Sequence, residues 1–131
     1  MSPELLKKRT KALALRIMRL AEALPRSRSA DVIGWQLVRC GTSVGANYRA
    51  ACRARSHADF IAKLKIVEEE CDETLFWLEL LVESGQVEAA LVRDLLSEAE
   101  AVLSIVVASI KTARARNRAV RVNRQSSIVN G

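Results

Sequence analysis

Apolar residues recur along this chain at intervals of three, four and seven positions, which is the spacing of one face of an α-helix. The first such run consists of Leu6, Leu13, Ile17, Leu20 and Leu24. Pro25 follows the run, and a proline cannot continue a helix because it has no backbone N–H to donate. The pattern therefore predicts a first helix over residues 3–24.

Three more runs with the same period predict helices over residues 29–54, 57–84 and 88–113. The second helix carries an apolar stripe of Ile33, Leu37, Cys40, Val44 and Ala51. The third carries Phe60, Leu64, Val67, Cys71, Leu75 and Leu78. The fourth carries Val92, Leu95, Ala99, Val102, Val106 and Ile110.

Polar residues and glycine mark the expected helix boundaries. Ser29 is the predicted N-cap of the second helix, and Ser56 is the predicted N-cap of the third, with Asp59 three residues further on. Gly85 follows the third helix and suits a left-handed C-terminal cap. The connections between the helices are therefore short.

Four helices with narrow apolar stripes and short connections predict an all-α fold, an antiparallel up-down-up-down four-helix bundle over residues 1–113. Scarce glycine and proline, and only 4% aromatic residues, agree with this class. Residues 114–131 lose the apolar stripe and gain arginine, so we expect a basic, disordered C-terminal tail.

The second helix contains a row of small residues beside its apolar stripe. Gly34, Gly41, Gly45 and Cys52 share this row when the helix is projected at about 100° per residue. Residues without large side chains allow a neighbouring helix to approach closely, and this interpretation is favoured over glycines that are merely tolerated. Asn47, at the margin of the stripe, is expected to bond to another helix.

The third helix has a second apolar face opposite the first. It consists of Ile66, Phe76, Trp77 and Leu80. A helix that is apolar on two sides has more surface to bury than one small bundle covers, which favours an interface between subunits. The alternative is an enlarged core that takes in Phe76 and Trp77.

Charge is distributed unevenly along the chain. The net charge is +6, but residues 1–60 carry +8, residues 61–100 carry −8 and residues 101–131 carry +6. The acids Glu69, Glu70 and Glu73 lie among the apolar residues of the second face and need partners. The predicted partners are Arg49 and Arg53, with Arg39 on the same face of the second helix, either within a subunit or across an interface. Charge reversal at Glu69 should then weaken assembly on a sizing column.

No residue pattern supports catalysis, a metal or a cofactor. A di-iron bundle needs two Glu-x-x-His pairs, whereas this chain has one histidine, His57, and three cysteines without CxxC spacing. Phosphate-binding loops and nucleophile motifs are absent from the sequence. We therefore expect a non-enzyme without a small-molecule substrate.

The chain also has no secretory h-region and no stretch of about eighteen apolar residues. We therefore expect no membrane partner and a cytoplasmic location.

The basic residues of the first helix and of the tail are the candidates for binding the phosphates of nucleic acid. They are Lys7, Lys8, Arg9, Lys11, Arg16, Arg19, Arg114, Arg116, Arg118, Arg121 and Arg124. Contacts of this kind are independent of sequence and depend strongly on salt. The alternative is that these residues form only a solvated face.

Residues 36–81, "QLVRCGTSVGANYRAACRARSHADFIAKLKIVEEECDETLFWLELL", resemble a family of small bacterial four-helix bundle proteins encoded in intervening sequences of large-subunit ribosomal RNA genes. The matching positions are Gln36, Leu37, Arg39, Ser43, Asn47, Arg53, Ser56, Phe60, Glu70 and Glu73. In "NYRAACRA", Arg49 or Ala50 stands where the commoner version of the motif has an acid.

The resemblance implies a bundle that assembles as a ring-like homopentamer. A relative, the accessory variability determinant of diversity-generating retroelements, binds nucleic acid and a reverse transcriptase. The implied partners are thus further copies of the chain, RNA or DNA, and a reverse transcriptase or other enzyme. Two hypotheses follow: an oligomeric nucleic-acid-binding protein, and a scaffold or accessory protein without a nucleic-acid role.

Overall fold

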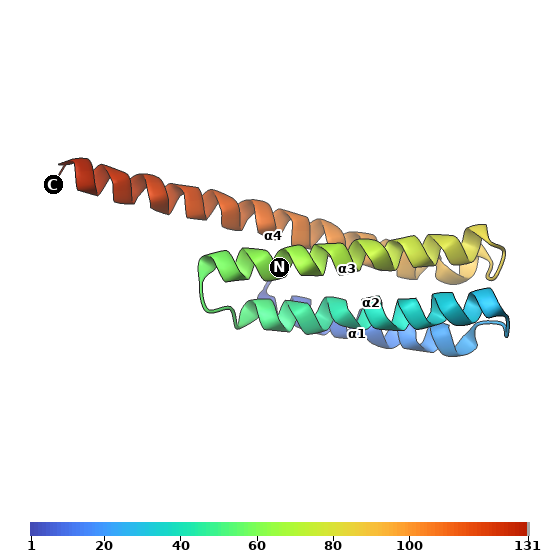
Figure 1. Ribbon diagram of the computed structural model, residues 1–131. Coiled ribbons are helices and arrows are strands. Elements are labelled where there is room, and N and C mark those ends of the chain that lie inside the picture. Colours follow the sequence, from blue (N-terminus) through green and yellow to red (C-terminus); the bar gives the residue numbers. More distant parts are fainter. Residues whose placement is uncertain (131) are drawn as a thin grey trace.

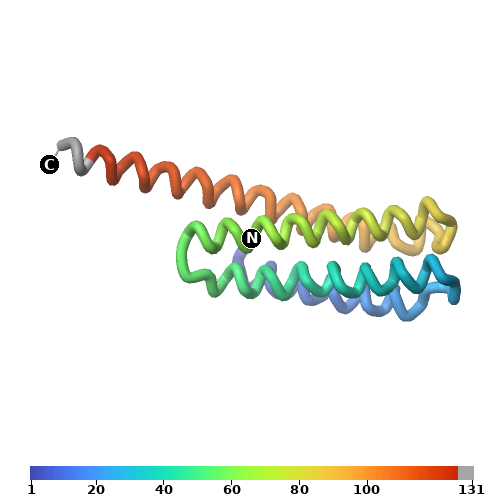
Figure 2. The backbone as a smooth tube through the Cα atoms, viewed as in Figure 1, coloured from blue at the N-terminus to red at the C-terminus, as the bar shows by residue number. Residues whose placement is uncertain are grey.

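The computed structural model describes residues 1–130. It consists of four long α-helices joined by three short connections (Figure 1). The helices are α1 (Pro3–Ala23), α2 (Arg28–Cys52), α3 (His57–Glu83) and α4 (Ala89–Asn130). The backbone trace reverses direction at each connection, so that successive helices are antiparallel (Figure 2). The predicted all-α, up-down bundle is confirmed.

Each helix packs against its neighbours in the chain, and α4 closes the bundle against α1. The predicted apolar stripes form the core: every member is buried except Leu24 and Phe60, which are half-buried. Two buried hydroxyls, on Thr10 and Thr74, donate to carbonyl oxygens one turn earlier in their own helices. This pairing removes the cost of burying an unsatisfied polar group.

Serine side chains begin α2 and α3. Ser56 Oγ accepts a hydrogen bond from the Asp59 amide at 3.1 Å, as predicted. The prediction for α2 is wrong by two residues, because Ser27 rather than Ser29 caps it and accepts from the Ala30 amide at 3.0 Å. Both serines suit a cap chemically, and Ser29 lies inside the first turn instead.

The end of α3 is a glycine cap. Gly85 has a φ of +77°, in the left-handed region that a residue with a Cβ rarely adopts. The Gln86 amide donates to the Leu81 carbonyl at 3.0 Å, and the Gly85 amide donates to the Val82 carbonyl at 3.0 Å. These two bonds form a Schellman motif, which turns the chain directly into α4.

The row of small residues on α2 faces α1, as predicted. A Cβ added at Gly41 would lie 2.5 Å from Ile17 Cδ1, and one added at Gly45 would lie 3.2 Å from Thr10 Oγ1. At Gly34 the nearest atom would be Leu24 Cδ1, at 3.1 Å. The glycines therefore allow α1 and α2 to approach more closely than alanine would.

The structure corrects the prediction of a disordered tail after residue 113. Burial does end at Ala113, but α4 remains helical through Asn130. The reason is local: residues 89–130 contain no glycine or proline, and a helix nucleated in the bundle adds further turns at little cost. Gly131, the last residue of the predicted tail, lies outside the described residues.

None of the helices described is long and apolar enough to cross a membrane.

Candidate nucleic-acid interface

A basic groove lies between the first half of α1 and the second half of α2. Its lining residues are Glu4, Lys7, Lys8, Lys11, Ala14, Thr42, Gly45, Ala46 and Arg49, and its volume is about 490 Å³. Lys8, Lys11 and Arg49 are exposed, while Lys7 is half-buried and lies 3.2 Å from the Glu4 carboxylate. Four cations therefore face one groove that one carboxylate partly neutralises.

A second groove lies beside the connection between α2 and α3. It is lined by Ala50, Arg53, Arg55, Asp59 and Lys63, with a volume of about 720 Å³. Asp59 accepts from Lys63 Nζ at 2.7 Å and from the Arg55 amide at 3.2 Å. These hydrogen bonds, that from Lys63 first, lower the pKa of the Asp59 carboxyl. Three cations again outnumber one acid.

The α4 extension, residues 114–130, leaves the bundle at this same end (Figure 1). His57 Nε2 lies 2.6 Å from the Ala113 carbonyl oxygen, which fixes α4 to the start of α3 just before the helix departs. Arg114, Arg116, Arg118, Arg121 and Arg124 are all exposed on the extension. Basic side chains from all four helices thus gather at one end of the bundle, called here the basic end. Its members are Lys7, Lys8, Lys11, Arg49, Arg53, Arg55, Lys63 and the five arginines of the α4 extension.

The predicted phosphate-binding residues of α1 divide into separate groups. Arg9 turns toward α4, where Nη2 lies 2.6 Å from Glu98 Oε1 and Nε lies 3.1 Å from Oε2. This bidentate hydrogen bonding raises the pKa of Arg9 and engages its guanidinium, so Arg9 is a structural residue. Arg16 and Arg19 lie further along α1, outside the basic groove. The lysines at positions 7, 8 and 11 remain on the groove.

The predicted ion-pair cluster exists in the structure, but with Arg39 at its centre. Arg39 Nη1 lies 3.4 Å from Glu70 Oε2, and Nη2 pairs with Glu73. Trp77 Nε1 also donates to Glu73 Oε2, at 3.1 Å. Because all three ionic side chains are partly exposed, the cluster contributes only about 1 kcal/mol to stability.

Among the described residues of one chain, Arg39 alone pairs with these carboxylates, and the pairing of Arg49 and Arg53 across an interface stays a prediction. Arg49 lines the basic groove, and Arg53 lines the groove beside the α2–α3 connection. Glu69 is exposed and lines a different groove, with Glu68 and Asp72, between α3 and α4. The two arginines therefore belong to the basic end. Asn47 also differs from expectation, because its amide donates to the Ser43 carbonyl of its own helix at 2.9 Å.

The second apolar face of α3 agrees in part with an enlarged core and in part with an interface between subunits. Trp77 and Leu80 are half-buried and pack against the core, as an enlarged core requires. Phe76 and Ile66 remain 51% and 41% exposed. The Phe76 and Trp77 rings meet edge to face, with centroids 4.9 Å apart. One chain therefore leaves part of this face uncovered.

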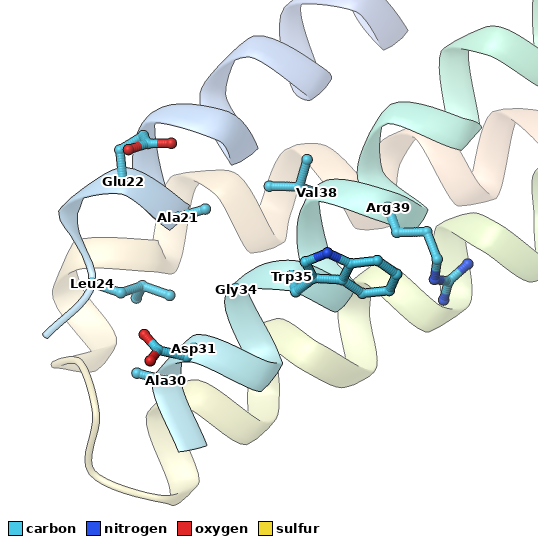
Figure 3. A pocket seen from close by; sticks show the side chains of 9 residues that line it. All are labelled: Ala21, Glu22, Leu24, Ala30, Asp31, Gly34, Trp35, Val38 and Arg39. Atoms are coloured by element: carbon cyan, nitrogen blue, oxygen red, sulfur yellow. The ribbon is translucent and has the colours of Figure 1, made fainter. Parts of the chain in front are cut away.

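A largely apolar groove lies at the opposite end of α1 and α2 from the basic end. Figure 3 shows Ala21 and Leu24 on one side of it and Gly34, Trp35 and Val38 on the other. Trp35 is 68% exposed, and its indole lies alongside the Arg39 side chain (Figure 3). This groove offers apolar surface together with Glu22, Asp31 and Arg39, and it lies away from the cations of the basic end.

Two of the three cysteines, Cys40 and Cys71, are buried where their thiols are unreactive. Burial raises the pKa of the Cys71 thiol to about 12 and also raises the pKa of Cys40. Cys71 Sγ donates to the Ala99 carbonyl at 3.3 Å, and Cys40 Sγ accepts from Thr74 Oγ1 at the same distance. Such thiols stay protonated at neutral pH and behave as small apolar side chains.

Among residues 1–130, no group of three or more potential ligands is placed to hold a metal ion.

Two members of the basic end, Arg55 and Lys63, were not predicted from the sequence. The spacing of Asp59 and Lys63, four residues apart on one helix, does predict their ion pair. Their place beside Arg53 depends on the turn between α2 and α3, which the apolar pattern does not describe.

The fold and this surface define the class: a small four-helix bundle with one strongly basic end. Residues 5–108 match the family model described as 23S rRNA-intervening sequence protein. The chain belongs to this family, as the resemblance predicted.

A solved structure from Bacteroides thetaiotaomicron, described as a protein with unknown function from the S23 ribosomal protein family, is similar to the chain. The two are 33% identical with a TM-score of 0.79, and the match covers 85% of this chain and 99% of the other. A search of curated proteins finds no match.

Proposed function

We propose that this protein is a non-catalytic, oligomeric bundle that binds the phosphate backbone of nucleic acid through its basic end. The observation that carries the proposal is the gathering of Lys8, Lys11 and Arg49 on one groove, at the same end of the bundle as Arg53 and the arginines of the α4 extension. Helix packing brings these cations together from distant parts of the sequence. Each of the two grooves is lined by a single acid, Glu4 or Asp59, so the local field favours a polyanion.

The chemistry of these groups favours affinity without sequence readout. Lysine and arginine side chains on an open groove neutralise phosphates and release condensed counterions. Stacking of unpaired bases needs exposed aromatic rings. Among the described residues of the basic end, Tyr48 is buried, Phe60 is half-buried, and the exposed ring of His57 is held by the Ala113 carbonyl at 2.6 Å. We therefore propose binding that depends on charge and shape.

Titration of the protein with a structured RNA and with duplex DNA at two salt concentrations tests the proposal. We expect binding at micromolar protein that weakens about 10- to 1,000-fold between 50 and 200 mM salt. The proposal fails if neither nucleic acid shows salt-sensitive binding in this range.

We further propose that the chain assembles as a ring-like homopentamer, using the exposed part of the second apolar face. Phe76 and Ile66 lie on α3 beside the half-buried Trp77, which supports an interface at this face. Such an assembly would repeat the basic end around the ring. Several weak phosphate contacts would then act on one nucleic acid, which raises the overall affinity.

Phe76→Glu is expected to dissociate the assembly, because it places a charge in an apolar interface. Light scattering after size exclusion should give about five times 14.5 kDa for the wild type and a mass near 14.5 kDa for the variant. Leu91→Glu is the control, since Leu91 is also an exposed apolar residue, at 65% against 51% for Phe76, but lies at the start of α4. An unchanged mass for Phe76→Glu would place the interface elsewhere.

The second candidate function is a scaffold or accessory protein that binds another protein, such as an enzyme encoded nearby. The groove beside Trp35 supports it, because a large exposed indole beside apolar side chains is typical of protein-binding surfaces. The titration above separates the two candidates. A scaffold without a nucleic-acid role would show no salt-sensitive binding.

A further inference from the structure

The α4 extension is a separate structural feature from the bundle. Ala113 is the last buried residue among the α4 side chains that the structure describes, up to residue 126, and the family match ends at residue 108. Residues 114–130 nevertheless continue the same helix for about 25 Å and project past the other three helices (Figure 1). The core of the bundle does not need these residues, so their regular form calls for another role.

Cations follow one face of the extension. Lys111, Arg114, Arg118 and Arg121 are spaced three, four and three residues apart, which places them in one line along the helix. All four are exposed, and residues 101–131 contain no acid that could pair with them. We call these four residues the basic line.

The face next to the basic line is the one that packs inside the bundle. Ile110 and Ala113 end the buried stripe of α4, and Asn117 and Val120 continue its spacing beyond the bundle. Val120 is 47% exposed. The extension thus presents Asn117, Val120 and the exposed Arg124 between the basic line on one side and Arg116 on the other.

The dimensions of an α-helix suit one kind of duplex. A helix with its side chains is about 10–12 Å across, and the major groove of B-form DNA is about 12 Å wide. The major groove of A-form RNA is too deep and narrow for side chains to read. In the DNA groove the two basic flanks would meet the phosphates of both strands, and Asn117 and Val120 would face the base edges.

We propose that the α4 extension is a DNA-binding helix that lies in the major groove of duplex DNA. This inference rests on the proposed function and names both its ligand and the element that holds it. A continuous helix that leaves a helical bundle and enters the major groove is an established way for proteins to bind DNA. The grooves on α1, α2 and α3 then contact the flanking phosphates.

Arg114→Gln/Arg118→Gln/Arg121→Gln tests the basic line. With a 24-base-pair DNA duplex in fluorescence anisotropy, we expect affinity to fall at least tenfold and the slope of log K against log salt to fall by about 2.5. Arg26→Gln/Arg28→Gln/Arg93→Gln is the control, because it removes the same charge from exposed positions at the opposite end of the bundle. It should bind almost as the wild type does.

Val120→Pro tests whether the helix, rather than the charge alone, is required. Proline breaks the hydrogen bonding of the preceding turn but leaves every arginine in place. We expect Val120→Pro to lose at least fivefold in DNA affinity while Val120→Ala binds as the wild type. Equal affinity of the two variants would mean that the extension acts as a flexible basic tail, and would overturn the inference.

The remaining outcomes separate this inference from the proposed function. If the wild type binds DNA and the basic-line variant binds equally well, the inference is overturned and the proposed function stands. If an RNA duplex of the same sequence binds as tightly and is equally sensitive to the variants, insertion into the DNA groove is overturned. A variant that changes the assembled mass but not DNA affinity would place the extension against another copy of the chain. If no nucleic acid binds, both proposals fail.

Discussion

Gly41→Ala is expected to lower the free energy of unfolding by about 1–3 kcal/mol, although alanine is the better helix former. The added Cβ would lie 2.5 Å from Ile17 Cδ1 and 3.0 Å from Ile17 Cγ2. Ile17 is fully buried and branched at Cβ, so its side chain has one preferred rotamer in a helix and no free space to enter. The helices α1 and α2 must therefore separate.

Gly34→Ala is the matched control, because it makes the same change on the same face of α2. Its Cβ would lie 3.1 Å from Leu24 Cδ1, the tip of a half-buried side chain at the end of α1, and in ordinary contact with Ala21 Cβ at 3.9 Å. The higher helix propensity of alanine should then dominate the change in stability. We expect the free energy of unfolding to stay the same or to rise by up to about 1 kcal/mol. Urea unfolding followed by circular dichroism measures both variants. Equal stabilities would show that close approach at Gly41 is not required.

Lys8→Glu/Lys11→Glu/Arg49→Glu is expected to reduce nucleic-acid affinity by about 100-fold or more. The three residues face the basic groove and are exposed, so the change replaces attraction to phosphate with repulsion and leaves the core untouched. Anisotropy titrations at a single salt concentration measure the loss. A melting curve shows whether the bundle remains folded.

The control for this variant is Arg26→Glu/Arg28→Glu/Arg93→Glu. Each reversal removes two charges, so both triple variants have a net charge of 0 in place of +6. The control residues are exposed at the opposite end of the bundle. If both variants lose the same affinity, binding follows net charge, and the basic groove has no special role.

The sequence alone predicts the helices and the core because one signal, the helical period of apolar residues, dominates this chain. Leu13, Leu37, Leu64 and Val102 are all fully buried where the period places them. Gly41 and Gly45 were predictable for the same reason, since position around a helix follows from residue number. The cap of α2 was not, because Ser27 and Ser29 offer the same chemistry two residues apart.

The ion pairs depend on a property that the helical period of apolar residues does not predict. The period predicts which face of α2 a residue occupies but not its level along the bundle. Antiparallel helices place residues equally far from their shared connection side by side. Arg39 is about as far before the α2–α3 connection as Glu70 is after it, and the two pair. Arg53 adjoins the connection, so it lies near Lys63 instead. The predicted position of the turn is therefore enough to identify Arg39 as the partner of Glu70.

The C-terminal part of α4 marks another limit. Loss of the apolar stripe after residue 113 correctly indicates the end of packing, but packing and helix formation are separate properties. Alanine and arginine are good helix formers, so a helix can continue into solvent without an apolar face. Composition alone did not distinguish such a helix from a disordered tail.

Lysine acylation read by mass spectrometry shows whether nucleic acid lies on the basic end of the bundle. The reaction rates of Lys8, Lys11 and Lys65 are compared in the free protein and with saturating duplex DNA at low salt. All three are exposed, but Lys65 lies on α3 beside the acids Glu68, Glu69 and Asp72. We expect slower acylation of Lys8 and Lys11 in the complex and an unchanged rate at Lys65. Unchanged rates at all three lysines, with the DNA bound, would contradict binding at the basic end.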